Sequence, residues 1–330
     1  MDPNLYQAAS QLSPDEGRVA RLYALAVSPG EASRLESHVR KGLWVVAALL
    51  LGCGLIFWVA ANWQEQSRMF RLGLIEGALL VSVLTACLWP RVRLAALFCA
   101  TLVLGGLLAF VGQTYQTGAD AWQLFAVWAA LALIWVALSR SDWLWLLWVL
   151  ITATGIVMWT GRFDLWDTFS DGPGSQTQVL LNMALWVMLA IVPGLVSLIP
   201  ALRVQGGMGW WSHRVALGCA LAGWTGLGVM QVLAGYDGHI SVPVLMVAAL
   251  LIGTTLWLSL KGRFQDFVCI CLGTLAVNAL VLALVGRWVA QDIGVESFLI
   301  FGLIAMGCLG LSVRWLMGVQ RSLRAQEVAP

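Results

Sequence analysis

The stretch that decides the fold is Gly112 to Trp122, which reads Gly-Gln-Thr-Tyr-Gln-Thr-Gly-Ala-Asp-Ala-Trp. It is polar, yet apolar runs at 94–111 and 121–138 flank it directly. A bilayer hydrocarbon core of about 30 Å is crossed by roughly 20 apolar residues of helix. Each flanking run is close to that length, so we predict that the stretch turns at a membrane surface between two membrane-spanning helices.

The composition of the whole chain agrees with a membrane protein. Of its 330 residues, 60% are hydrophobic and 11% are charged, and the mean hydropathy is +0.83. These values lie outside the usual range of soluble domains. The 19 Trp and 34 Gly fit the same class, because Trp concentrates at membrane interfaces and Gly lets membrane helices approach closely. We therefore predict an all-α, polytopic integral membrane protein that is embedded in the lipid bilayer.

Ten segments have the length and apolar character of membrane-spanning helices, or come close to it. They are 43–61, 72–89, 94–111, 121–138, 143–160, 179–200, 214–234, 242–260, 267–286 and 297–317. Pro193-Gly194 interrupts the sixth segment and predicts a kink there, because proline removes an internal hydrogen bond. The chain is thus expected to consist of a helical module at 1–42, a transmembrane bundle at 43–317 and a short tail at 318–330.

The distribution of cations predicts the orientation of the bundle. If the N-terminus is cytosolic, the outside segments hold four cations, Arg68, Arg71, Arg162 and Arg287, which leaves 15 of the 19 Lys and Arg inside. Lys and Arg concentrate in cytoplasmic loops. We therefore predict a multi-pass protein of the bacterial inner membrane with both termini in the cytosol.

Residues 1–42 are predicted to form a small cytosolic helical module. Ser13-Pro14-Asp15-Glu16 and Ser28-Pro29-Gly30-Glu31 each place a capping Ser before Pro and Glu, which is the pattern of a helix start. Two interpretations remain open. The module packs on itself or on the membrane surface, or it docks a membrane-protein partner.

Several classes of function have no support in the sequence. The seven Cys fall in apolar segments, no CxxC pair occurs and there are only three His, so we predict neither a disulfide framework nor a metal site. The net charge of +2 is too small to indicate binding of nucleic acid. The motifs HExxH, GxSxG, Walker A and the Rossmann glycines are missing. No cofactor and no catalytic residue is predicted, and the substrate is unknown.

Polar residues gather on the predicted outer face and form a candidate site. This outer polar cluster consists of Asn62, Trp63, Arg68, Arg71, Glu76, Gln113, Tyr115, Gln116 and Asp120. Asp120 has no cation nearby in the sequence, and Arg68 and Arg71 form a basic pair. A salt bridge between them is expected to join two outer loops into a cap. The alternative is that these groups bind a polar ligand such as a glycan or a lipid headgroup.

Glu76 is the acidic residue that falls inside a predicted span, where an ionised carboxylate is costly. Its spacing from Arg71 and Arg68 favours an ion pair that holds the first helical hairpin together. The alternative is a carboxylate that couples to a proton or to a substrate. The two interpretations differ in whether Glu76 has a cationic neighbour.

Three amides, Asn182, Gln231 and Asn278, also fall inside predicted spans. A buried amide needs a hydrogen-bonding partner. We interpret these residues as hydrogen bonds between neighbouring helices. If several of them converged on one place, they would instead form a polar site.

The first part of the chain resembles a known family. The residues that carry the resemblance are Gly52-Cys53-Gly54, Ala60-Ala61-Asn62-Trp63, Arg68, Arg71 and Gly112-Gln113-Thr114-Tyr115-Gln116. With these motifs, about residues 1–145 resemble the bacterial predicted membrane proteins called domain of unknown function 2157. The resemblance implies a short cytosolic helical start, an Ala-Asn-Trp hairpin and a Gly-Gln-x-Tyr-Gln crossing. It implies no activity.

These observations predict an envelope-associated or complex-forming membrane component with a polar outward-facing surface. One alternative is a secondary transporter or flippase for a small polar or amphipathic solute, with Glu76 and the buried amides along its pathway. Another is a membrane-embedded transferase. The positions of the polar side chains discriminate between the first two. Convergence on a water-accessible cavity would favour transport, and separate one-to-one hydrogen bonds would favour the structural component.

Overall fold

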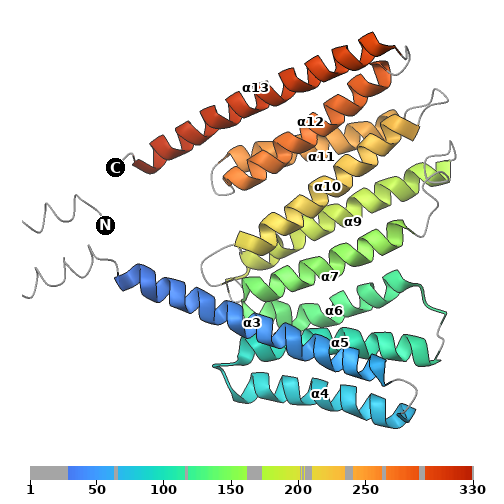
Figure 1. Ribbon diagram of the computed structural model, residues 1–330, viewed down its shortest axis with the longest axis vertical. Coiled ribbons are helices and arrows are strands. Elements are labelled where there is room, and N and C mark those ends of the chain that lie inside the picture. Colours follow the sequence, from blue (N-terminus) through green and yellow to red (C-terminus); the bar gives the residue numbers. More distant parts are fainter. Residues whose placement is uncertain are drawn as a thin grey trace, which may run out of the picture. The chain divides into compact units, whose positions relative to one another are not determined.

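A computed structural model of the chain describes residues 29–62, 66–115, 118–161, 173–200, 202, 204, 210–234, 241–261, 265–289 and 294–328. Within these residues the chain forms ten α-helices and no strand (Figure 1). Each of these ten helices is long and apolar enough to cross a membrane. The predicted all-α, polytopic fold is therefore confirmed.

The helices follow the ten predicted segments in order. They are α3 (Pro29–Ala61), α4 (Arg68–Leu88), α5 (Arg93–Tyr115), α6 (Ala121–Ser139), α7 (Asp142–Thr160), α9 (Pro173–Leu198), α10 (Trp210–Ala234), α11 (Val242–Leu260), α12 (Phe267–Val289) and α13 (Val295–Val328). The largest differences lie at the two ends of the chain. α3 enters the first span from Pro29 without a break, and α13 continues past the predicted end of the last span. The rest of the N-terminal module, residues 1–28, lies outside the described residues.

The stretch from Gly112 to Trp122 joins two helices as predicted, but its polar turn is shorter than expected. Gly112 to Tyr115 complete α5, and α6 begins at Ala121. Gly118 has a φ of +65°, a backbone conformation that glycine adopts at no steric cost. The end of α5 at Tyr115 and the start of α6 at Ala121 are thus closer to each other in the sequence than the two ends of the predicted stretch.

The chain divides into two compact units, Met1–Phe110 and Val111–Pro330. In the first unit, α3 packs against α5 at two glycines. A Cβ at Gly52 would lie 3.0 Å from Cδ1 of Leu102, and a Cβ at Gly106 would lie 3.0 Å from Cγ1 of Ile56. Each glycine thus accepts a branched apolar side chain from the opposite helix, which brings the two backbones close together.

The second unit is organised around α10, which packs against α7, α9, α11 and α12 (Figure 1). Trp186 of α9 lies over Gly223 of α10, where a Cβ would be 2.5 Å from the indole Nε1. Trp224 donates a hydrogen bond from its own Nε1 to the carbonyl oxygen of Met183 at 3.1 Å. α6 packs against α7, and α13 lies along α12. α9 continues through Pro193, so this proline does not end the helix.

Many large apolar side chains are exposed on the surface of the described helices. In water they would be unfavourable, whereas in a bilayer they face lipid and the helices satisfy their own backbone hydrogen bonds. At the end of α11, Nζ of Lys261 lies 4.4 Å from the ring centroid of Trp257, a pairing that suits a membrane interface. The ten apolar helices and these surfaces identify a multi-pass membrane protein.

Candidate functional site

The outer polar cluster is divided between the two units. The first unit contains Asn62, Arg68, Arg71 and Glu76, and the second contains Gln113, Tyr115 and Asp120. Trp63 and Gln116 lie outside the described residues. A salt bridge between Arg71 and Asp120 would join residues of different units, and it stays a prediction.

Arg71 is the buried member of the cluster among its described residues, with 7% of its surface exposed. Its Cζ lies 5.9 Å from the ring centroid of Phe110 on α5, within the range of a cation–π interaction. Ser67 caps the start of α4, because its Oγ accepts a hydrogen bond from the N–H of Phe70 at 3.2 Å. Arg71 therefore contributes to the packing of α4 on α5.

Glu76 is exposed on α4 and forms no ion pair with the part of the chain that the structure describes. The expected pair with Arg71 is thus not formed. The reason is helical geometry. Five residues of helix correspond to a rotation of about 140°, so the two side chains leave α4 in different directions. Arg68 lies eight residues, or about 12 Å, along the axis from Glu76.

A set of polar contacts that the sequence did not single out joins the starts of three helices. Asp142, at the start of α7, accepts hydrogen bonds from the first turn of α10. Its Oδ2 lies 3.0 Å from the backbone N of Trp211, and its Oδ1 lies 3.1 Å from that of Ser212. The first N–H groups of a helix have no partner within the helix and carry partial positive charge. The carboxylate of Asp142 satisfies two of them and fixes α7 to α10.

Arg214, one turn further along α10, binds Asp266 at the start of α12. Nε lies 2.6 Å from Oδ2 and Nη2 lies 3.0 Å from Oδ1, a bidentate pair. Oδ1 also accepts a hydrogen bond from the N–H of Val268 at 3.0 Å. Burial by itself would raise the pKa of Asp266, but the hydrogen bonds from Arg214 and Val268, together with the guanidinium charge, lower the pKa below its usual value. The ionised carboxylate holds α10 and α12 together.

Separate hydrogen bonds join other pairs of helices in this unit. Asn182 of α9 donates from Nδ2 to Oγ1 of Thr160 at the end of α7. Arg287 of α12 donates from Nη1 to the carbonyl oxygen of Val232 on α10 at 2.7 Å. Gln231, the preceding residue, is buried on α10. These contacts lie toward the helix ends opposite to Asp142 and Asp266.

Asn278 makes its contact in the middle of α12. Its Nδ2 donates to Oγ of Ser312 on α13 at 2.9 Å, and this hydroxyl lies 3.1 Å from Oδ1 of the same amide and donates to it. Asn182 and Asn278 therefore bind different neighbours on different pairs of helices. Neither residue lines the cavity described below.

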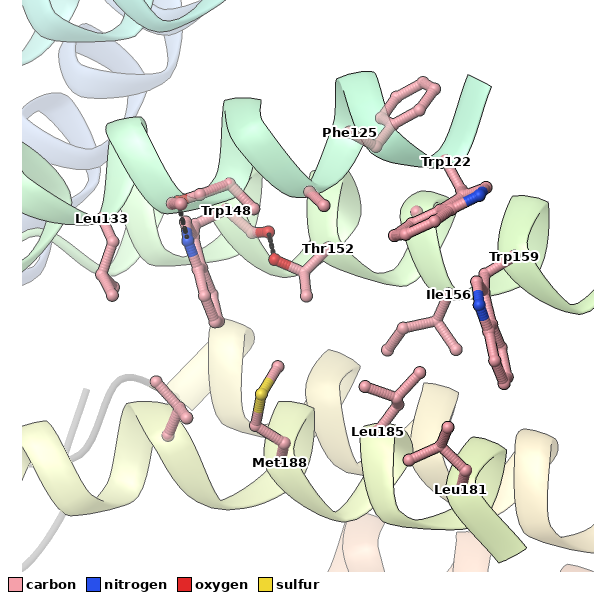
Figure 2. A pocket seen from close by; sticks show the side chains of 15 residues that line it. Trp122, Phe125, Leu133, Trp148, Thr152, Ile156, Trp159, Leu181, Leu185 and Met188 are labelled. Atoms are coloured by element: carbon pink, nitrogen blue, oxygen red, sulfur yellow. Dashed lines mark hydrogen bonds between the residues drawn. The ribbon is translucent and has the colours of Figure 1, made fainter. Parts of the chain in front are cut away.

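An apolar groove of about 430 Å³ lies in the second unit, between α6, α7 and α9 (Figure 2). Trp148 and Thr152 of α7 contribute polar atoms to it, and both atoms are bonded within the protein. Nε1 of Trp148 donates to the carbonyl oxygen of Ala129 at 2.9 Å, and Oγ1 of Thr152 donates to the carbonyl oxygen of Trp148 at 2.9 Å. The described residues that line the groove carry no charged side chain.

The groove results from small side chains on α6 and α7. A Cβ at Gly155 of α7 would lie 3.0 Å from Cβ of Phe125 on α6, so the two helices are close at this point. Ala126 and Ala130 of α6 line the groove and leave space beside α9. In the sequence these alanines indicated only an apolar span, because their effect depends on which helix lies opposite.

The first part of the chain, which contains the outer polar cluster, is similar to a known protein family. Residues 12–145 match the family described as predicted membrane protein (DUF2157). The resemblance expected from the sequence is confirmed. The DUF2157 match covers less than half of the 330 residues and ends near the start of α7. It includes the whole outer polar cluster, whereas α9 to α13 lie beyond it. The chain matches no curated protein and no solved structure.

Proposed function

We propose that this protein is a structural, complex-forming component of the bacterial inner membrane, with both termini in the cytosol. The observation that carries the proposal is the one-to-one pairing of polar side chains inside the described spans of the second unit. Asn182 binds Thr160, and Asn278 binds Ser312. Such pairs hold helices together in a membrane, where an unsatisfied polar group is costly.

The alternatives have less support. A transporter for a polar solute needs polar groups that face a water-filled path or converge near the middle of the membrane. The groove between α6, α7 and α9 is apolar, and its polar atoms are already bonded within the protein. A transferase would need a nucleophile or an acid–base pair beside a substrate pocket. Among the described residues that line this groove, the hydroxyl of Thr152 donates to the carbonyl oxygen of Trp148 and has no acid or base beside it.

We assign the contact with another membrane protein to two regions. One is the N-terminal module, residues 1–42. The other is the outer polar cluster, in which Gln113 and Asp120 are exposed and Tyr115 is 64% exposed. Tyrosine is frequent among the residues that dominate binding energy at protein interfaces, because it combines a large apolar ring with a hydroxyl group.

The test of this role compares deletion strains that carry the wild-type protein, Tyr115→Ala or Tyr115→Phe at native expression levels. We expect the wild-type protein to migrate on a native gel as an assembly larger than the purified chain. Tyr115→Ala should shift it to smaller species, and Tyr115→Phe should retain most of the assembly because the ring is kept. Migration of the wild type at the size of the purified chain would contradict the proposal.

A second measurement addresses transport directly. Small metabolites and lipids are profiled in the deletion strain and in strains that carry the wild type or Asn182→Leu. A structural role predicts that no single solute accumulates in the deletion strain. Accumulation of one solute that is corrected by the wild type, and not by an equally abundant, folded Asn182→Leu protein, would favour a transporter.

The orientation is tested by cysteine labelling in a background without the native cysteines. Ser141→Cys is expected to react with a membrane-impermeant thiol reagent only after the cells are opened, and Thr117→Cys is expected to react in intact cells. Labelling of Ser141→Cys in intact cells would refute the cytosolic placement of both termini.

A further inference from the structure

We propose that the groove between α6, α7 and α9 binds a single hydrocarbon chain of a membrane lipid. The inference rests on the dimensions, the polarity and the position of the groove. It does not depend on the complex-forming role proposed above.

The length of the groove matches one leaflet of a bilayer. Three helix segments of equal length line the groove. They are Trp122 to Leu133 on α6, Trp148 to Trp159 on α7 and Leu181 to Val192 on α9, and in each the last residue follows the first by 11 positions. At about 1.5 Å per residue each stretch is roughly 16 Å long. The hydrocarbon core is about 30 Å thick, so the groove extends over about half of it.

The volume of the groove selects the kind of occupant. The volume of about 430 Å³ is smaller than that of an α-helix of the same length, which at about 10 Å in diameter and roughly 16 Å in length occupies on the order of 1,200 Å³. An α-helix with its side chains is about 10–12 Å in diameter and does not fit. A linear hydrocarbon chain does fit, whereas a helix of a second protein or of a second copy would rest outside the groove.

The polarity of the lining also selects hydrocarbon. Trp148 and Thr152 have no N–H or O–H donor left for a ligand, because both already donate to backbone carbonyl groups. A peptide or a sugar would lose its hydrogen bonds to water and gain none in exchange. A hydrocarbon chain has no such loss. Since lipid tails are already in an apolar environment, the chain is retained by close contact with the walls and not by the hydrophobic effect.

The position of two tryptophans indicates where the chain enters. Figure 2 shows Trp122 and Trp159 at one end of the groove and Leu133 and Trp148 toward the other. Trp122 lies in the first turn of α6 and donates from Nε1 to Oδ2 of Asp120 at 3.2 Å. Indole rings with a polar edge belong at the level of lipid headgroups. The headgroup is therefore placed beside Trp122 and Trp159, and the tail extends from there toward the membrane interior.

The experiment uses the full chain in phosphatidylcholine vesicles that contain a trace of phosphatidylcholine with a photoreactive diazirine in one acyl chain. After irradiation, the labelled peptides are identified by mass spectrometry. We expect labelling of α6, α7 and α9 at the groove to exceed, several-fold, the labelling of α13, whose span is not buried by the described residues of the protein. Equal labelling of the groove and of α13 would overturn the proposal.

Variants that fill the groove provide the specific control. Ala126 and Ala130 line it from α6 and are exposed, whereas Ala249 is exposed on α11 and lies elsewhere. The double variant Ala126→Phe and Ala130→Phe should reduce groove labelling several-fold, and Ala249→Phe should leave it unchanged. An equal decrease in both proteins would overturn the proposal. If the double variant does not fold, Ala130→Leu is used and a smaller decrease at the same peptides is expected.

A competition experiment distinguishes the source of the chain. Excess palmitic acid and excess unlabelled phospholipid with other headgroups are added separately to the labelled vesicles. A decrease with excess phospholipid supports the proposed lipid chain, whereas a decrease with palmitic acid alone, or with neither competitor, would overturn it. Loss of groove labelling as the amount of protein per vesicle is raised would indicate that a second copy of the chain covers the groove and would overturn the proposal.

Discussion

α10 and α13 are both long apolar helices of the second unit, yet their surroundings are opposite. Half of the residues in the most apolar part of α10 are buried inside the protein. In the corresponding part of α13, none of the described residues is buried. At Gly223 and Gly228 of α10 an added Cβ would lie 2.5 Å from Trp186 and 2.8 Å from Leu280. At Gly307 of α13 it would meet nothing within 4 Å.

This difference shows that hydropathy does not decide which helix forms the core of a membrane protein. Lipid tails and leucine side chains are similarly apolar, so an apolar helix is stable in the membrane whether it faces protein or lipid. α10 is central because glycines admit aromatic and branched side chains from its neighbours, and because Asp142 and Asp266 bind groups near its start. α13 is attached through fewer specific contacts, among them the pair of Asn278 and Ser312.

The largest expected effect is that of Gly223→Leu compared with Gly307→Leu. At Gly223 the new side chain must displace the buried ring of Trp186, so we expect a loss of more than about 3 kcal/mol of stability, beyond the usual range of overpacking. At Gly307 we expect no loss, because Gly is a poor helix former and the site is open. Unfolding in mild detergent, followed by fluorescence-detected size exclusion, measures both. Equal losses of stability in the two variants would contradict the difference in packing between α10 and α13.

A smaller effect is expected from removing apolar volume. Leu221 of α10 is 2% exposed and Leu303 of α13 is 65% exposed. Leu221→Ala should lower the free energy of unfolding by about 2–3 kcal/mol, because it leaves a cavity in the protein. Leu303→Ala should change it by less than about 0.5 kcal/mol, because lipid fills the space. The same unfolding assay applies, and a larger loss for Leu303→Ala would show that protein covers α13.

The ion pair of α10 predicts a dependence on pH. The lowered pKa of Asp266 means that its carboxylate contributes stability above the unfolded pKa, about 3.9, and that this contribution is lost as the pH falls through the lower folded value. Asp266→Asn should therefore cost about 1–2 kcal/mol at neutral pH, a value reduced by partial exposure. The difference from wild type should decrease as the pH falls below the unfolded pKa and vanish only below the lower folded pKa.

The control for this prediction is Glu296→Gln, which removes an exposed carboxylate from the start of α13. It should change the stability by less than about 0.5 kcal/mol over the same pH range. Denaturation curves of the three proteins between neutral and acid pH provide the comparison. A difference between wild type and Asp266→Asn that persists unchanged at the acid end would contradict the assigned role of the carboxylate.

The smallest effect concerns the contact that joins α13 to α12. A double-mutant cycle with Asn278→Ala and Ser312→Ala should give a coupling energy of about 0.6 kcal/mol, the average for hydrogen bonds between membrane helices. Thermal unfolding of the wild type, the two single variants and the double variant measures it. If the stability losses of the two single variants simply add up in the double variant, the two side chains do not interact and apolar contacts hold α13 on α12.

The order and approximate bounds of the ten helices were predictable, because about 20 apolar residues suffice to cross a bilayer whatever lies beside them. The helix ends in polar segments were predictable in part: the start of α3 at Pro29 agrees with the capping pattern of Ser28-Pro29, but the continuation of this helix into the first span was not predicted. Residues 29–42 precede the first predicted span, and the structure continues α3 through them, since a helix does not have to end where the membrane ends. The resemblance over residues 12–145 was also visible, because short motifs carry it.

The contacts that position the helices were less accessible from the sequence. Asp142 binds N–H groups 69 and 70 residues away, and Arg214 binds Asp266 across 52 residues. Periodicity and local motifs describe neighbours within a few turns and give no information at that distance. The expected ion pair of Glu76 and Arg71 does not form, because residues five positions apart on a helix point in different directions although they are close in sequence.

The apolar character of each segment is enough to predict that this chain enters a membrane as ten helices, since the bilayer responds to each segment separately. The tertiary structure was needed to show that α10 packs against four helices, that the span of α13 is exposed on the surface of the protein and that alanines on α6 leave a groove beside α9. The physical reason is that lipid and protein interior are equally apolar. The choice of neighbours therefore depends on shape and on hydrogen-bond geometry between residues far apart in the chain.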